Sequence, residues 1–152
     1  MPIAPRSTGL DPKKLNGIVI DDLEAVRKGF ESTSATISPY VGSSYRHDGG
    51  VNRGSQSAIY TPKIPAAGKY EVRLSYSPNG NRATNVPVTI THQGSTSVVK
   101  VNQRQTPKID KTWVSLGTFT FEEGNKGKVE ISNKDVNGFV VIDAVQWLKV
   151  KE

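Results

Sequence analysis

The feature that most limits the fold of this chain is a strict alternation of apolar and polar residues in short runs. The clearest run is GKYEVRLSYS, residues 68–77, in which every second side chain is apolar or aromatic. These side chains are Tyr70, Val72, Leu74 and Tyr76. A repeat of two places them on one face of a β-strand and is incompatible with the 3.6-residue repeat of an α-helix.

Similar runs return along the chain, separated by turn-forming segments such as PAAG, PNGN, HQGS and EEGNKG. The predicted strands lie within residues 17–22, 56–62, 68–77, 85–92, 96–101, 113–121, 127–133 and 139–150. About eight or nine short strands, each with one polar face, predict an all-β fold of the jelly-roll β-sandwich kind. Pro87 has no backbone N–H, so its strand is expected at a sheet edge or with a bulge. The stretch DLEAVRKGF is a helical candidate too short to be assigned.

The alternation starts only after the first 16 residues, which separates an N-terminal segment from the predicted domain. Residues 1–16 are predicted to be a linker or flexible N-terminal segment, and residues 17–152 a single β-sandwich domain. The chain has no cysteine, so disulfides and thiolate chemistry are excluded. No apolar run approaches the roughly 20 residues of a membrane span, and the N-terminus lacks the apolar segment of a signal peptide. We therefore expect no membrane as a partner.

The charge of the chain bears on its partner. A net charge of +6 favours an anionic partner such as an acidic polysaccharide, although a modest positive charge can also serve solubility alone. The basic residues are scattered, with no run of five or more, so nucleic acid is not predicted as a partner.

An ordered set of motifs resembles a known family. The segments YVGSSYRHDGG, NGNRATNVPVTITHQG, WVSLGTFTFEEGNKGKVEISN and VVIDAVQWL follow one another as in golvesin C-terminal-like domains, also described as the carbohydrate-binding-like domain of xanthan lyase. The resemblance covers about residues 18–148. It implies a galactose-binding-like β-sandwich with an accessory role in a larger bacterial protein, extracellular or periplasmic. Glycan binding follows from the resemblance by analogy.

Catalytic residues are not predicted. The two histidines, His47 and His92, are far apart in sequence, and the surroundings of the serines resemble no nucleophile motif. Glycoside hydrolysis needs two opposed carboxylates, whereas most acidic residues here lie in polar turns. The sequence therefore indicates a domain that is not an enzyme.

Three aspartates form a candidate metal site. The segment IVIDD opens the predicted sandwich and VVIDAV closes it, and the first and last strands of a jelly roll are often neighbours. Asp21 or Asp22 could then approach Asp143, and such carboxylates with loop carbonyls suit a structural calcium ion. The interpretation that we prefer from sequence alone needs no metal: Asp143 accepts hydrogen bonds from backbone N–H groups, or pairs with an Arg or Lys.

Polar residues of the predicted loops form a candidate ligand site. Sugar recognition uses planar polar side chains and an aromatic face, and an anionic sugar adds an Arg. The predicted ligand-binding residues are Tyr45, Arg46, His47, Asn52, Arg82, Asn85, Arg104 and Trp113. The alternative is that these side chains only organise the loops, because Asn, Asp and Gly favour turns and Arg can brace carbonyl groups. The sequence leaves both readings open.

The side to which Trp113 points is also left open. If Val114 and Leu116 face inward, Trp113 faces outward, and a bulge at Gly117 returns the following phenylalanines to the core. Without that bulge, Trp113 belongs to the core. Trp147, near the end of the last strand, is predicted to pack.

These observations predict a non-catalytic carbohydrate-binding-type module that binds an extracellular polysaccharide on behalf of a larger protein. The net charge favours an acidic polysaccharide. The alternative is a structural or protein-interaction domain that packs against its parent protein and has no glycan ligand. An exposed apolar patch would favour the alternative, whereas a cleft with Arg, Asn and an aromatic ring would favour glycan binding.

Overall fold

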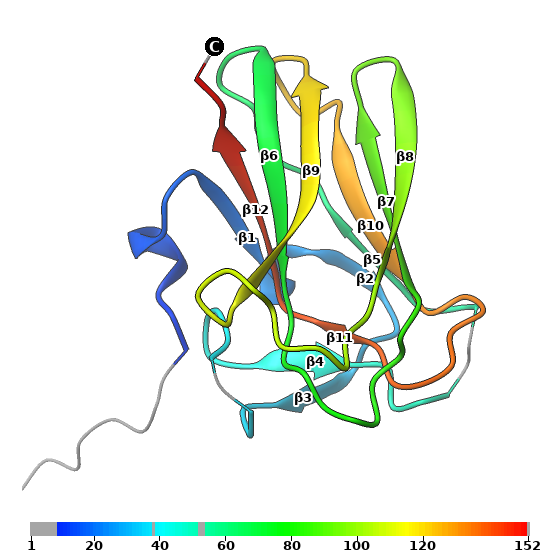
Figure 1. The fold of residues 1–152 in the computed structure, drawn as a ribbon. Helices are drawn as coiled ribbons and strands as arrows, with labels where there is room; N and C mark the ends of the chain where they lie inside the picture. Colours follow the sequence, from blue (N-terminus) through cyan, green and yellow to red (C-terminus); the bar gives the residue numbers. More distant parts are fainter. Residues whose placement is uncertain (1–8, 38, 52–53, 152) are drawn as a thin grey trace, which may run out of the picture.

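A computed structural model describes residues 9–37, 39–51 and 54–151, and these form three antiparallel sheets (Figure 1). The first sheet has the strand order β1-β12-β6-β9. Its strands are β1 (Ile18–Asp21), β12 (Ala144–Lys149), β6 (Gly68–Ser75) and β9 (Trp113–Phe121). The alternating run of residues 68–77 thus contains an inner strand, β6, with a partner on each side.

The second sheet has the order β2-β5-β10-β7-β8 and packs against the first. Its strands are β2 (Val26–Lys28), β5 (Ser57–Tyr60), β10 (Lys128–Ser132), β7 (Val86–His92) and β8 (Ser95–Val101). A small third sheet, in the order β11-β4-β3, lies at one end of the sandwich. Its strands are β11 (Val141–Ile142), β4 (Tyr45–His47) and β3 (Ser32–Ser34).

The predicted all-β sandwich is confirmed, with twelve described strands instead of the eight or nine expected. The strands that were not predicted are β2, β3 and β4, each of three residues. Runs this short contain too few residues for an alternation to be recognised. The helical candidate forms the 3₁₀ turn η2 (Asp22–Glu24) followed by β2.

The core lies between the two large sheets and is built from the apolar positions of the alternating runs. On β6, Val72 and Leu74 are fully buried, whereas Glu71 and Arg73 on the opposite face pair at 2.9 Å. Trp147 is fully buried in the same core, which confirms its predicted packing role. Burying apolar area of this kind is the main source of stability for such a sandwich.

The expectation for Pro87 is wrong in one respect. Strand β7 is an inner strand, between β10 and β8, and its register with β8 is regular through Pro87. The pairing with β10, however, ends at Val88. Pro87 lies one residue beyond that end, so an inner strand accommodates it where only one partner remains.

The described part of the N-terminal segment contacts the domain. Leu10 forms a parallel bridge to Val41, and the backbone N–H of Leu10 donates to the carbonyl of Tyr40 at 2.7 Å. The short 3₁₀ helix η1 (Pro12–Lys14) follows, and Leu15 packs on the outer side of the first sheet. Residues 1–8 of the predicted linker lie outside the described residues.

In the parts of the chain that the structure describes, we find no helix with the length and hydropathy needed to cross a membrane.

Candidate functional site

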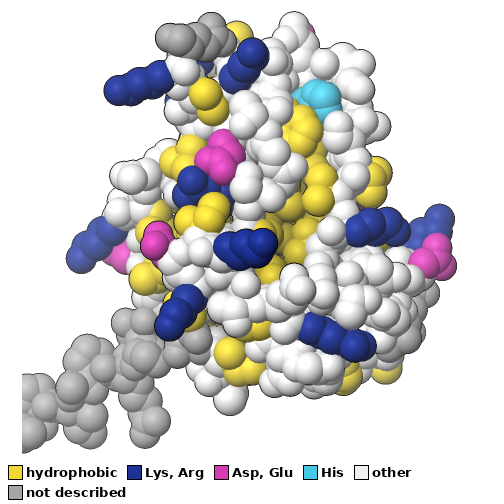
Figure 2. Space-filling view, viewed as in Figure 1, with side chains coloured by type: hydrophobic (Ala, Val, Ile, Leu, Met, Phe, Trp, Pro, Cys, Tyr) yellow, Lys and Arg dark blue, Asp and Glu magenta, His cyan; other side chains and the backbone are white. Residues whose placement is uncertain are grey.

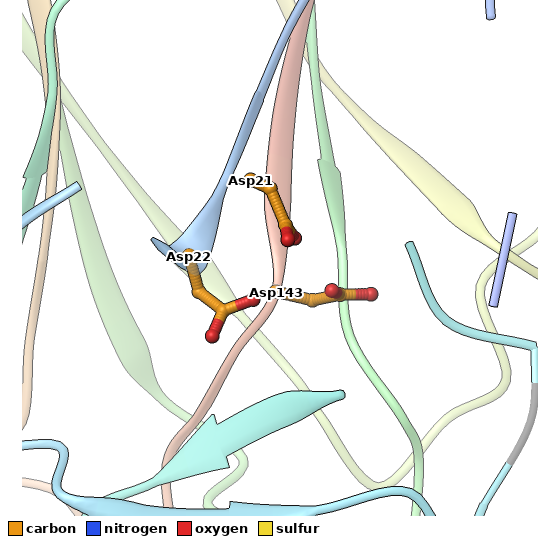
Figure 3. A group of neighbouring side chains, drawn as sticks. All are labelled: Asp21, Asp22 and Asp143. Carbon is orange, nitrogen blue, oxygen red and sulfur yellow. The ribbon is translucent and has the colours of Figure 1, made fainter. Parts of the chain in front are cut away.

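The three predicted metal-binding aspartates lie together in the structure (Figure 3). Strand β1 pairs with β12, and Asp21 is opposite Ala144, which places Asp143 beside it. Asp22 follows at the start of η2. One oxygen atom from each of the three carboxylates lies within 4.8 Å of the others. The expected proximity of the first and last strands is therefore confirmed, and it brings these carboxylates together.

The structure contains parts of both metal-free interpretations, and these provide hydrogen bonds to two of the six carboxylate oxygen atoms. The backbone N–H of Val41 donates to Oδ2 of Asp143 at 2.9 Å, and Nε of Arg46 donates to Oδ2 of Asp22 at 3.1 Å. Oδ1 of Asp21, of Asp22 and of Asp143 is buried and has no hydrogen-bond partner among the described residues. Buried carboxylate oxygens are normally bonded, so this cluster lacks a partner.

The backbone comes unusually close to the cluster at Gly42. Its φ angle is +75°, and a Cβ atom at this position would lie 2.3 Å from Oδ2 of Asp21. Position 42 therefore requires glycine, because any side chain there would collide with the Asp21 carboxylate.

Burial changes the proton affinity of all three carboxyl groups. It raises the pKa of Asp22 to about 8, with a further contribution from the neighbouring Asp21. Burial also raises the pKa of Asp21, and it raises the pKa of Asp143 well above its usual range. Arg46 offsets only part of this effect at Asp22. In the absence of a cation, these shifts favour the protonated, neutral form of the carboxyl groups.

This shift predicts how the stability of the metal-free protein depends on pH. Between about pH 4 and pH 8 the folded state holds more protons on Asp22 than the unfolded chain does, so unfolding becomes easier as the pH rises. We expect the melting temperature, measured in the presence of EDTA, to contain a component that falls from pH 5 to pH 8. The variant Asp22→Asn should lack the part of that fall that Asp22 contributes, so its melting temperature should decrease less over this range. A wild-type curve that matches the variant curve over this range would contradict the prediction.

Several of the predicted ligand residues, among them Arg82, Asn85 and Arg104, lie at the end of the sandwich that carries the third sheet. Three loops meet there, residues 76–85, 102–112 and 133–140, and we call this region the loop end. Ala83 donates its N–H to Phe139 O, and Gln103 donates its N–H to Ala83 O. The loops therefore form one hydrogen-bonded unit.

Arg82 is the centre of this unit and is 7% exposed. Its Nε donates to Ser77 O at 3.1 Å, and its terminal nitrogens donate to Ser77 Oγ and to Asn81 Oδ1. Arg104 in turn donates from Nε to Arg82 O at 2.6 Å, but the Arg104 side chain is exposed. The two arginines thus differ: Arg82 is used within the protein, and Arg104 presents its guanidinium to solvent.

The Asn85 side chain links two loops at the surface. Its Nδ2 donates to Asp135 O at 2.9 Å, and its Oδ1 accepts from the Asn137 N–H. Asn137 also contacts Thr84 through its own amide. These groups brace the loop, yet they remain at the exposed surface.

Strand β4 supplies the next predicted residues. Tyr45 is buried, with its hydroxyl accepting the Ile37 N–H, and Arg46 is held by Asp22. His47 is half-buried and lies edge-on to the ring of Phe139, with 6.0 Å between the ring centroids. Asn52 lies outside the described residues. Of this group, His47 is the side chain with a polar ring at the surface.

Trp113 lies on the outer side of the first sheet, as predicted for a strand with a bulge at Gly117. The register of β6 with β9 shifts between Val72 and Arg73, and Gly117 has a φ angle of +123°. Trp113 packs with Val41 and Ala144, away from the main core. It is only 4% exposed, so its ring offers no free face for a sugar.

Sequence reasoning missed two residues of the loop end, Phe139 and Asn137. Both lie in the segment KDVNGFVV, which was interpreted as a turn leading into the last strand. Their positions depend on the bridge between Arg82 and Phe139, a contact between residues 57 positions apart (139 minus 82). A local pattern carries no signal for such a contact.

The chain is similar to part of a larger enzyme. It is 33% identical over 143 residues to xanthan lyase of Bacillus sp. (strain GL1), covering 90% of this chain and 15% of that protein. A solved structure of Paenibacillus xanthan lyase is 35% identical and matches with a TM-score of 0.83, over 88% of this chain and 13% of the enzyme. The chain thus spans only a small part of each.

A more distant structure shares the fold alone. The Podospora anserina GH26-CBM35 β-(1,4)-mannanase matches with a TM-score of 0.66 at 15% identity, over 91% of this chain and 29% of that protein. The sequence model of the golvesin C-terminal domain matches residues 18–149, nearly all of the described sandwich. The chain therefore belongs to the golvesin C-terminal domain family.

Proposed function

We propose that this domain is a non-catalytic module that binds an extracellular polysaccharide on behalf of a larger bacterial protein. Family membership supports this, together with the small share of xanthan lyase that the domain represents. The name of that relative indicates an enzyme that acts on a polysaccharide. Binding to polysaccharide, attachment to a parent chain and location outside the cell are parts of the same proposal.

The observation that carries the proposal is the exposed polar surface of the loop end. Arg104 presents a guanidinium, Asn85 an amide, and His47 with Phe139 a pair of partly exposed rings. Planar donors and a ring face are the groups that proteins use for sugar hydroxyls, sugar carboxylates and the C–H face of a pyranose. The loops that hold them are already hydrogen-bonded, so little ordering is required on binding.

The acidic residues support a binding role over catalysis. The three carboxylates that lie together, Asp21, Asp22 and Asp143, are between 0% and 4% exposed, so a polysaccharide cannot reach them. A glycosidase needs two carboxyl groups on opposite sides of the bond that it cleaves. The buried cluster is a stabilising element in this proposal.

We further propose that the aspartate cluster holds a structural calcium ion. All its ligand atoms are carboxylate oxygens, which Ca²⁺ prefers, and three of them lack a partner among the described residues. A bound divalent cation would neutralise the carboxylates that protons otherwise neutralise. The cluster joins β1, η2 and the β11–β12 connection, so an ion there would link both ends of the chain.

Affinity electrophoresis tests the polysaccharide proposal. The gels contain xanthan, alginate or polygalacturonate as acidic polymers, or dextran or methyl-esterified polygalacturonate as neutral ones, at low and moderate salt. We expect retardation by at least one polymer that persists in moderate salt, with a dissociation constant between micromolar and millimolar, roughly 4–8 kcal/mol. Arg104→Ala should weaken the retardation severalfold, whereas Lys28→Ala on the distant strand β2 should not.

The outcomes separate the two readings of the domain. Retardation that is unchanged in Arg104→Ala would leave the function in place and remove Arg104 from the site. Retardation by all acidic polymers that disappears with salt would indicate charge attraction alone. Absence of retardation by every polymer would favour the second candidate function, a structural domain that packs against its parent protein.

A further inference from the structure

One side of the sandwich is open between strands β8 and β9. Each is the last strand of its sheet, and the two face each other across the gap between the sheets. Three core residues remain only half-buried on these strands: Val99, Val114 and Phe119. The core is therefore incompletely covered along this edge.

The open side is hollowed into a groove. A pocket of about 380 Å³ lies beside the 102–112 loop, and a second of about 160 Å³ continues along β8 and β9. Tyr76 and Val114 line both pockets, so the two lie next to each other. The Tyr76 ring is held in place because its hydroxyl donates to the carbonyls of Asn102 and Gln105, at 3.1 and 2.6 Å. The floor therefore contains apolar side chains and a Tyr76 ring whose position is fixed by two hydrogen bonds.

An aromatic pair lies further along the same edge. The rings of His92 on β7 and Phe119 on β9 are 4.8 Å apart and tilted by 33°, and both residues are half-buried. Figure 2 shows a band of apolar side chains on this face of the molecule, with basic side chains on either side. From Val114 to Phe119 the strand rises about 17 Å at roughly 3.3 Å per residue. An extended chain of several sugar rings fits this length.

The charges around the groove have one sign. Lys100 lines one pocket and Lys108 the other, and both are exposed. The ion pairs formed among the described residues involve neither lysine. Of the described residues that line these two pockets, none is acidic, and the other polar ones are amides and hydroxyls. An anionic ligand with many hydroxyl groups complements this lining.

We propose that the groove between β8 and β9 binds an extended stretch of an acidic polysaccharide. Sugar rings lie along the apolar floor, and a carboxylate lies beside Lys100 and Lys108. This inference rests on the proposed function and adds to it a second surface and the class of its ligand. Gln105 and Arg104 are neighbours on one loop, so the groove continues the loop end and a single polymer chain can contact both.

The test compares two double variants with the same change of net charge. Lys100→Glu/Lys108→Glu alters the groove, and Lys28→Glu/Lys128→Glu alters exposed positions on β2, at the opposite edge of the sheet, and on β10. Both are run through gels containing polygalacturonate and its methyl ester at moderate salt, after thermal melts confirm that they are folded. We expect the groove variant to bind polygalacturonate about tenfold more weakly than the control variant. The wild type should be retarded by polygalacturonate and much less by the uncharged ester.

Each other result overturns a distinct part of the inference. Equal weakening of both double variants would mean that net charge and not the groove attracts the polymer. Undiminished binding by the groove variant would place the site elsewhere and leave the proposed function intact. Equal retardation by polygalacturonate and its ester would remove the requirement for an anion. If none of the acidic or neutral polymers retards the wild type, both this inference and the proposed function fail.

Discussion

Calcium is expected to raise the melting temperature of the metal-free protein by roughly 5–10 °C when present at about 100 times its dissociation constant. At that excess, a ligand that binds only the folded state adds about 2.7 kcal/mol of stability. For a chain of this length, each kcal/mol corresponds to about 2–4 °C. The physical reason is the cluster of Asp21, Asp22 and Asp143, in which three buried oxygens have no partner among the described residues. The measurement is a thermal melt after EDTA treatment, with and without added CaCl₂.

Asp143→Asn separates a metal site from a purely structural cluster. The amide oxygen can still accept the Val41 N–H, so the backbone contact is kept while one carboxylate ligand is lost. We expect the variant to lose most of the calcium response. At pH 8 in EDTA it should be at least as stable as the wild type, because its folding no longer requires a proton to be taken up at position 143. Asp135→Asn, in an exposed turn with φ +56°, serves as the matched control and should keep the response. A calcium response that is equal in both variants, or is reproduced by magnesium, would contradict the proposed site.

Arg82→Ala is expected to destabilise the protein by about 2–4 kcal/mol, which lowers the melting temperature by roughly 5–15 °C. The change removes a buried side chain that donates to Ser77 O, Ser77 Oγ and Asn81 Oδ1, and it leaves these acceptors at the junction of the loops. Thermal and urea melts measure the loss. Arg104→Ala, at an exposed position, should cost less than about 1 kcal/mol.

The comparison of these two arginines distinguishes support of the loops from contact with a ligand. If Arg82→Ala is as stable as the wild type and loses only polysaccharide binding, Arg82 contacts the ligand and the interpretation of the loop end is wrong. If it is destabilised while Arg104→Ala is stable and binds less well, the roles follow the exposure of the two side chains. Arg82→Ala is therefore a poor probe of binding on its own, because loss of loop order would also reduce affinity.

The alternation of residues along β6, β7 and β10 determined the fold class, because a repeat of two is a property of the strand backbone itself. It also indicated the inward faces, and with them Val72 and Leu74 as core residues. The packing of Trp147 was predicted from its place near the end of the last strand. The pairing of first and last strands, and so the meeting of the three aspartates, followed from the general form of a jelly roll. Strands β2, β3 and β4 could not be predicted, since three residues show no repeat and their pairing depends on distant partners.

The candidate site, like the fold, has features that the sequence predicts and features that depend on tertiary contacts. Side-chain chemistry is enough to indicate which residues could bind a sugar or a cation, and this can be read from the sequence. The packing of the loops and sheets, in contrast, buries Arg82, leaves Arg104 exposed and covers Trp113 with Val41. The groove between β8 and β9 likewise exists only because both strands end their sheets. The hydrogen-bond partners of a polar side chain depend on which loops lie next to it in space. For this reason the chemistry of a residue such as arginine does not distinguish a side chain that supports the loops from one that contacts a ligand.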